Sequence, residues 1–248
     1  MTRNEFDKVT DKLIGVTDYI YLHVLGEPLC HPEVCDFIRL ATVKGFKCAI
    51  TTNGTLLDRC GESIIDAGVY KLNISVHSLE DGTEQEYKRY LNSCIAFADK
   101  ASKSGVLTVL RLWNKGYDNG KNLDTVTALR EFFSDSEWQE GKRGARIRHK
   151  LHLEYGERFN WPSMDISPLG DEVFCYGLAD HFGILSDGRV IPCCLDREGD
   201  ITLGNIFEEC ISDILSGERA VSIKEGFKVN KAQEQLCKRC GYARRFKI

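Results

Sequence analysis

The stretch KCAITTNGTLLDRCGESIIDAGVYKLNISVH, residues 47–77, decides the fold of this chain. It begins with a short β-rich run, continues with apolar residues at helical spacing, closes that segment on glycine and ends in a second β-rich run. Strands that alternate with helices form a parallel sheet covered by helices, with a site in the loops that follow the strands. The stretch therefore predicts an α/β fold.

The same alternation extends on both sides of this stretch. Strands are expected at 19–24, 47–52, 70–77, 106–113 and 149–154, and helices at 32–45, 56–68, 83–105 and 123–133. A further helix, residues 4–15, precedes the first strand, so the pattern begins in the middle of an α/β unit. Pattern alone leaves two architectures open: a barrel without its first strand, and an open sheet with an N-terminal helix packed on one face.

The character of the sequence changes after residues 157–172, where proline, glycine and turn residues replace long helical patterns. The segment HFGILSDGRVIPCC, residues 181–194, predicts two short strands joined by an Asp-Gly turn. A short helix is expected at 205–217, followed by a polar tail. We therefore expect an α/β domain over residues 1–160 and an α+β domain over residues 170–248 that is small enough to need a metal staple.

Composition restricts the possible functions. The 248 residues carry a net charge of -4, which gives no basic field to attract nucleic acid. No apolar run is long enough to span a bilayer, and the first residues lack the pattern of a secretory signal. We therefore expect a cytoplasmic protein whose thiols are reduced, so that some of the eleven cysteines serve as metal ligands.

The motif CKRCGY, residues 237–242, supplies half of a candidate metal site. Cys237 and Cys240 need two more soft ligands, and Cys175 and Cys193 flank the predicted hairpin in the same small region. A thioredoxin-like dithiol fits poorly, because that motif needs a long following helix. Spacing alone does not separate a zinc ion from an iron-sulfur cluster.

The other cysteines are expected to play structural parts. Cys194 follows Cys193 directly and would point away from it in a strand, so it is expected to be a spare. Four isolated cysteines on strand or helix patterns are expected in the core: Cys48, Cys60, Cys94 and Cys210. Two cysteines near the first loop match no ligand motif and are expected to be structural: Cys30 and Cys35.

Several motifs resemble those of radical SAM enzymes. The stretch LHVLGEPLCHPEV, residues 22–34, resembles their Gly-Gly-Glu-Pro motif, with Leu25 in place of the first glycine. The stretch ITTNGTLL, residues 50–57, resembles their Thr-Asn-Gly strand, and LNISVHS, residues 72–78, resembles their fourth strand.

The C-terminal cysteines are similar to those of the region called SPASM in its shortened twitch form. The similarity lies in the order of Cys175, Gly188, Cys193, Cys237 and Cys240, together with DGRVIPCC and LGNIFE. The resemblance implies a partial (β/α)6 radical SAM barrel that lacks its first strand, followed by a small α+β twitch domain. It also implies one auxiliary [4Fe-4S] cluster held by the four cysteines.

The resemblance implies an oxidoreductase that uses S-adenosylmethionine (SAM). SAM would bind a second [4Fe-4S] cluster and yield a 5'-deoxyadenosyl radical, which takes a hydrogen atom from a small molecule or peptide. The cofactor supplies the difficult chemistry, and the protein orients it. A reductant such as flavodoxin or ferredoxin is the implied partner.

Site residues can be carried over by position. Gly26, Glu27 and Pro28 would hold the methionine amino group of SAM, and Arg111 would meet its carboxylate. Asn53 and Ser75 lie near the ends of neighbouring strands, where a barrel builds its site. Structural alternatives are a turn for Asn53, sheet filling for Ser75 and a surface charge for Arg111. Four further residues stay unassigned because their register is unknown: His77, His149, His152 and Glu154.

The sequence departs from the family at one important place. The Cys-x3-Cys-x2-Cys motif that holds the radical-generating cluster does not occur in these residues. Our hypothesis is that Met1 is an internal methionine or that the chain is truncated, so that SAM and the second cluster bind only if the missing N-terminal segment is present. The alternative is a degenerate, non-catalytic protein that binds iron-sulfur or zinc.

Overall fold

The computed structural model describes residues 1–79, 81–118 and 120–246. The chain forms two compact units, one of Met1–Val16 with Phe159–Ile248 and the other of Thr17–Arg158. The helix α1 (Arg3–Leu13) therefore groups with the C-terminal residues, whereas the sequence places it in the first domain. The boundaries 1–160 and 170–248 stay a prediction.

The unit Thr17–Arg158 is built on a seven-stranded sheet of order β1-β2-β3-β4-β7-β6-β5. Strands β1 to β4 and β7 are parallel, and β6 and β5 continue the sheet antiparallel. The parallel strands are β1 (Tyr19–Leu22), β2 (Lys47–Thr52), β3 (Lys71–Ser75), β4 (Leu107–Lys115) and β7 (Leu151–Glu157). All five correspond to strands expected from the sequence, so the parallel sheet is confirmed.

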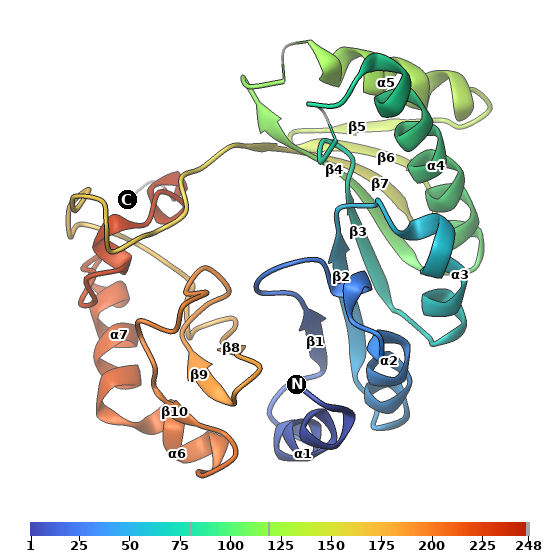
Figure 1. Ribbon diagram of the computed structural model, residues 1–248. Helices are drawn as coiled ribbons and strands as arrows, with labels where there is room; N and C mark the ends of the chain where they lie inside the picture. Colours follow the sequence, from blue (N-terminus) through green and yellow to red (C-terminus); the bar gives the residue numbers. More distant parts are fainter. Residues whose placement is uncertain (80, 119, 247–248) are drawn as a thin grey trace. The chain divides into compact units, whose positions relative to one another are not determined.

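The helices of this unit lie along one side of the sheet, as Figure 1 shows. They are η1 (Pro28–Cys30), α2 (Val34–Val43), α3 (Leu57–Asp66), α4 (Glu84–Lys103) and α5 (Lys121–Phe132). The start of α4 is fixed by a capping box, in which the side chains of Thr83 and Glu86 each accept a hydrogen bond from the other's backbone N–H. The four α-helices stand where the sequence pattern predicts them, whereas η1 was not expected.

The two faces of the sheet differ in character because successive side chains point to opposite sides. Leu72, Ile74 and Leu110 are completely buried, as expected on the face that the helices cover. On the other face lie residues of the alternate set that stay partly exposed. We call this the polar face; it is defined by Lys71, Ser75, Arg111, His152 and Glu154.

The antiparallel edge of the sheet is not anticipated by the sequence. It is a hairpin of β5 (Gln139–Gly141) and β6 (Gly144–Arg148). Gly144 has φ of +146°, and a Cβ at this position would collide with the backbone of Leu153. This close approach requires glycine, and it lets β6 pair with β7.

The second unit has a small antiparallel sheet and its own core. Its elements after residue 159 are β8 (Gly183–Ile184), β9 (Arg189–Ile191), β10 (Gly204–Asn205), α6 (Ile211–Ser216), α7 (Glu218–Lys228), η2 (Cys237–Arg239) and η3 (Ala243–Arg245). The strand order is β10-β9-β8, and β8 pairs with β9 across the Asp187-Gly188 turn, so the predicted hairpin is confirmed. The expected polar tail is wrong in part, because it contains α7.

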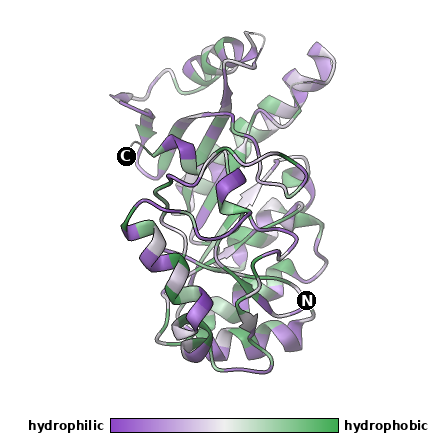
Figure 2. Cartoon of the chain, turned by 90° about the vertical axis from the view of Figure 1, so that its left-hand side faces the viewer, coloured by the Kyte–Doolittle hydropathy of each residue, from purple (hydrophilic) through white to green (hydrophobic). Residues whose placement is uncertain are grey.

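Helix α1 packs into this same unit. Its apolar face buries Phe6, Val9 and Leu13, and Figure 2 shows hydrophobic and hydrophilic stretches alternating along the helices of the chain. Lys12 Nζ donates hydrogen bonds to the carbonyl oxygens of Ile206 and Glu209. The residues at the two ends of the sequence therefore stabilise one another.

Candidate functional site: a polar sheet face and a cysteine cluster

The loop after β1 is fixed by the carboxylate of Glu27. Its Oε1 accepts hydrogen bonds from Leu29 N at 3.0 Å and Thr52 Oγ1 at 2.7 Å, and its Oε2 accepts one from Asn53 N at 2.7 Å. Glu27 thus ties the loop after β1 to the end of β2. A carboxylate has about four acceptor positions, so these three bonds leave room for a ligand.

The remaining residues expected around this loop are placed at strand ends. Gly26 is exposed with φ of +82°, and Pro28 begins η1. Asn53 follows β2, and its Oδ1 accepts from Thr55 N at 2.9 Å and Thr55 Oγ1 at 2.7 Å. The turn expected as the structural alternative for Asn53 is therefore present.

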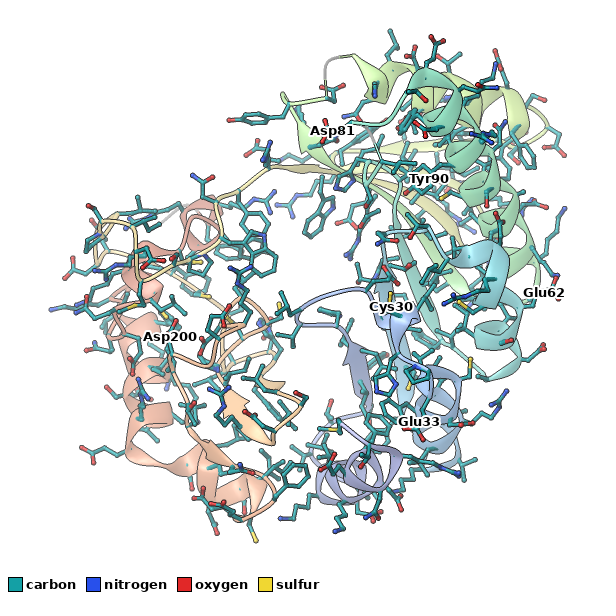
Figure 3. All side chains as sticks on the ribbon, in the orientation of Figure 1. Cys30, Glu33, Glu62, Asp81, Tyr90 and Asp200 are labelled. Carbon is teal, nitrogen blue, oxygen red and sulfur yellow. The ribbon has the colours of Figure 1, made fainter. Side chains whose placement is uncertain are left out.

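Tyr90 of α4 supports the loops after β2 and β3 from beneath. Its hydroxyl lies 2.6 Å from the carbonyl oxygen of Asn53 and 2.9 Å from that of Ser75. Burial raises the pKa of this phenol above its ordinary value, so Tyr90 stays a hydrogen-bond donor (Figure 3). Both candidate site residues are thus held through their backbones.

Arg111 is at the middle of a row that crosses three strands. Ser75 of β3 is opposite Arg111 of β4, which is opposite Glu154 of β7. Arg111 Nε lies 3.3 Å from Glu154 Oε2, and its side chain is only 18% exposed. The guanidinium also stacks over Trp113, with 4.7 Å between Arg111 Cζ and the centroid of the Trp113 ring. The surface-charge alternative for Arg111 is therefore wrong, because the side chain is mostly buried and ion-paired.

Sequence reasoning left His152 and Glu154 unassigned and did not consider Lys71. The structure places all three with Arg111 on the polar face, since the parallel register aligns Arg111 with Glu154 and Val109 with His152. The alternation in HKLHLE is visible in the sequence. The register of this strand against β4 is not visible in the sequence, and for this reason His152 and Glu154 could not be assigned to the site.

The second candidate site is a group of thiols, one buried and four partly buried, which we call the cysteine cluster: Cys175, Cys193, Cys194, Cys237 and Cys240. Cys193 follows β9, while Cys237 begins η2 and Cys240 directly follows it. Gly188, in the turn before β9, has φ of +86°, and a Cβ there would collide with Phe207. The short elements of this unit thus bring distant cysteines together.

The electrostatics show that these thiols are neighbours. Burial raises the pKa of Cys193 to about 12, and the thiols of Cys194, Cys175 and Cys240 contribute to the rise. Burial likewise raises the pKa of Cys237, with further contributions from Cys193, Cys175 and Cys240. Each thiolate would therefore repel the others, and a cationic metal centre would relieve that repulsion.

The expectation that Cys194 points away from Cys193 assumed that this segment is a strand, and that assumption is wrong. The segment after Ile191 is a series of bends and turns, so the alternation of a strand does not apply to it. After burial itself, the thiol of Cys240 is a cause of the raised pKa of Cys194. Cys194 therefore lies within electrostatic range of Cys240 and is the fifth thiol of the cysteine cluster.

The donor set fits an iron-sulfur cluster, whose irons are held by cysteine thiolates. Within residues 1–79, 81–118 and 120–246, no three Cys, His, Asp or Glu side chains lie close enough to hold a single metal ion. A cubane cluster puts each thiolate on a different iron, whereas zinc gathers four thiolates about one centre. The ligand set Cys175, Cys193, Cys237 and Cys240 stays a prediction.

The other cysteines are apart from this group. Cys48 and Cys94 are completely buried, as expected for core residues. Cys60 is partly buried on α3, while Cys30 is exposed at the end of η1 (Figure 3). The core expectation for Cys210 is wrong, because this residue is exposed at the surface turn that precedes α6.

Comparison with known proteins bears on both sites. A family described as "SPASM: Iron-sulfur cluster-binding domain" matches residues 175–241, which include all five thiols of the cysteine cluster. A protein named GTP 3',8-cyclase from Microcystis aeruginosa is 26% identical over 246 residues, covering 81% of this chain and 72% of that protein. Another of the same name from Chlorobaculum tepidum is 40% identical over 209 residues, covering 70% of this chain.

The chain belongs to the radical SAM superfamily. It spans 63% of the length of the Chlorobaculum tepidum relative. A solved structure described as native anSMEcpe with bound AdoMet covers 97% of this radical SAM protein with a TM-score of 0.59 and 13% identity. This likeness shows the fold, a partial radical SAM barrel-like sheet followed by a small antiparallel SPASM-like sheet.

Two further observations, on cysteine spacing and on helix length, complete the description of this radical SAM protein. None of its cysteines form the Cys-x3-Cys-x2-Cys motif. In the described residues, no helix combines the length and the apolar character needed to cross a membrane.

Proposed function

We propose that this radical SAM protein is an iron-sulfur oxidoreductase that removes a hydrogen atom from a small molecule or peptide. The observation that carries the proposal is the cysteine cluster, in which separated thiols meet within the segment that matches an iron-sulfur cluster-binding domain. Its auxiliary [4Fe-4S] cluster would be held by Cys175, Cys193, Cys237 and Cys240. The protein would work in the cytoplasm.

When bound, SAM with its own [4Fe-4S] cluster supplies a 5'-deoxyadenosyl radical for hydrogen abstraction. The residues of this chain would bind and orient SAM. Glu27 holds the loop after β1 rigidly against β2 and retains an acceptor position for an ammonium group. Gly26 and Pro28 would offer backbone carbonyls beside it.

The carboxylate of SAM would meet Arg111, whose planar guanidinium suits a two-pronged ion pair. The contacts with Glu154 and Trp113 hold this side chain in place on the polar face. Asn53 and Ser75 would line the same end of the sheet, positioned by Tyr90. This part of the proposal depends on a Cys-x3-Cys-x2-Cys segment, which these 248 residues do not contain.

The names of the relatives indicate a first substrate to test. Both proteins described above are called GTP 3',8-cyclase, so GTP is the first small molecule to examine. A low-potential reductant such as flavodoxin or ferredoxin would supply electrons.

Anaerobic reconstitution with iron and sulfide tests the proposal. The protein should bind about four iron and four sulfide per chain, and Cys193→Ser, Cys237→Ser or Cys240→Ser should lose most of this iron. Cys194→Ser is the matched control, because it changes a thiol in the same cluster and leaves the four proposed ligands in place. Iron content unchanged in all three ligand variants, or zinc without sulfide in anaerobically purified protein, would contradict the proposal.

A second candidate is a non-catalytic protein that binds an iron-sulfur cluster or zinc. It is favoured by the lack of Cys-x3-Cys-x2-Cys in these residues. Cleavage of SAM to 5'-deoxyadenosine by reduced protein separates the two candidates. Where in-frame codons for that motif precede Met1 in the gene, the longer protein should bind about eight iron atoms and cleave SAM.

A further inference from the structure

The polar face carries more positive than negative charge around Glu154. Lys71 lies within electrostatic range of Arg111 and Glu154. His152 lies within range of Arg146, Lys71 and His149. Since Arg146 is opposite His152 in the pairing of β6 with β7, these groups come from four adjacent strands and one turn. Three permanent cations and two histidines thus lie around the carboxylate of Glu154; they are Lys71, Arg111, Arg146, His149 and His152.

That carboxylate is already engaged. Glu154 pairs with Arg111 at 3.3 Å and is 37% exposed, so its charge is shared with Arg111 and screened in part by solvent. Lys71 is half-buried on the neighbouring strand β3. The positive charge at Lys71 and Arg146 is therefore not balanced by Glu154.

The titration behaviour of two of these groups agrees with the excess charge. Burial, followed by the cation of Arg111, lowers the pKa of Lys71, and Glu154 only partly opposes this. Burial lowers the pKa of His152 as well, and Arg146, Lys71 and His149 add to the effect. An anion placed between Lys71 and His152 would stabilise the charged form of both.

A buried polar atom lies on the same strand and face as Lys71. Asn73 is 1% exposed, and its Nδ2 donates to Thr51 Oγ1 at 3.1 Å. Its Oδ1 has no hydrogen-bond partner among the described residues. A buried acceptor without a partner is costly, so Asn73 adds an unsatisfied polar group to the strand that carries Lys71.

We propose that Lys71, His152 and Arg146 bind an oxyanion of the substrate on the polar face. The oxyanion is a phosphate or a carboxylate group. This inference rests on the proposed function, because it names the substrate class for that fold, and it assigns the substrate anion to residues other than Arg111.

The proposal fixes the direction of the pH dependence. An oxyanion raises the pKa of His152, so binding is accompanied by proton uptake and affinity falls as pH rises through the pKa of the bound state. The groups that face His152 are Arg146, Lys71 and His149, and the first two stay charged throughout this range.

The test is isothermal titration calorimetry on the full chain with its reconstituted auxiliary cluster and no SAM. Pyrophosphate is the phosphate probe, and glutarate is the carboxylate probe. Lys71→Met and His152→Gln should each weaken binding of the preferred probe by about tenfold or more. Lys88→Met is the matched control: it removes the same charge from an exposed position on α4 and should change affinity little.

Sulfate, whose charge is constant between pH 6 and 8, serves for the pH series. Its affinity should be higher at pH 6, and His152→Gln should abolish the difference. If pyrophosphate or glutarate binds, and Lys71→Met and His152→Gln weaken that binding, the proposal is supported. The probe that binds identifies the oxyanion as phosphate or carboxylate. Undetectable binding of both probes, or equal affinities in Lys71→Met and Lys88→Met, overturns it. Cluster assembly is measured separately, so such a failure leaves the proposed function standing.

Discussion

At the scale of single residues, a partly buried ion pair joins α4 to the antiparallel edge of the sheet. Arg148 Nη2 of β6 lies 2.5 Å from Asp99 Oδ1 and also donates to the Ser102 hydroxyl at 2.9 Å. Partial burial acts to raise the pKa of Asp99. Hydrogen bonds from Lys103 and Arg148 outweigh this and hold the pKa below its ordinary value.

We expect Asp99→Asn to lower the free energy of unfolding by about 1–2 kcal/mol at pH 7. Because the folded pKa of Asp99 is depressed, its contribution is complete above the unfolded pKa of about 4 and is lost as pH falls through the folded pKa. The difference from the natural protein should therefore shrink at pH 3. Urea denaturation at both pH values measures it.

The control for this prediction is Glu62→Gln. Glu62 pairs with Lys100 of the same helix α4, but its side chain is 75% exposed. Exposed pairs contribute little, so the change should stay within about 0.5 kcal/mol. Equal losses in Asp99→Asn and Glu62→Gln would show that the burial of the Asp99 pair has no energetic consequence.

At the scale of elements, the turn after β2 depends on Gly54. Its φ is +81°, and a Cβ there would lie 2.7 Å from Cys94 Sγ. Gly45 has a similar φ of +92° but nothing within 4 Å. We expect Gly45→Ala to cost about 1 kcal/mol for backbone strain alone, and Gly54→Ala to cost about 1–3 kcal/mol more because of the collision.

Denaturant midpoints of both variants measure these costs, and a double-mutant cycle isolates the collision. Cys94→Ala should recover much of the additional cost of Gly54→Ala, because it removes the sulfur atom that the new methyl group meets. A cycle with no coupling between positions 54 and 94 would mean that strain accounts for the whole effect.

The elements that the sequence predicts are those with strong local patterns. Strands β2 and β3 with α3 between them, and the Asp187-Gly188 hairpin, follow from periodicity and turn chemistry. The β5–β6 hairpin was missed because its strands are short and its pairing depends on a long-range approach at Gly144. Ser75 and Arg111 of the polar face were named from the sequence, but Lys71, His152 and Glu154 were not, because Glu154 meets Arg111 only through the register of β7 against β4.

The cysteine cluster likewise has a part that the sequence predicts and a part that it does not. Spacing and resemblance were enough to propose Cys175, Cys193, Cys237 and Cys240 as one group. They were not enough to place Cys194, because its position depends on bends after β9 rather than on a repeating pattern. Local patterns predict elements and candidate ligands, whereas irregular backbone decides which side chains finally meet.

At the scale of the whole molecule, the N-terminal helix and the C-terminal residues form one compact unit. The contacts of α1 are the burial of Phe6, Val9 and Leu13 and the hydrogen bonds from Lys12 to the carbonyls of Ile206 and Glu209. Since the proposed cluster ligands lie in this unit, loss of the cluster should affect both ends of the sequence and spare the sheet of Thr17–Arg158.

Hydrogen exchange followed by mass spectrometry tests this coupling on reconstituted protein. In Cys237→Ser, amides of α1 and α7 should exchange faster together, because metal binding stabilises the unit that contains both. Amides of β3 should keep their protection, as should all three elements in the control Cys210→Ser, which changes an exposed cysteine of the same unit. If α7 loosens while α1 stays protected, α1 is held by contacts independent of the cluster, and the coupling between the two ends of the chain is refuted.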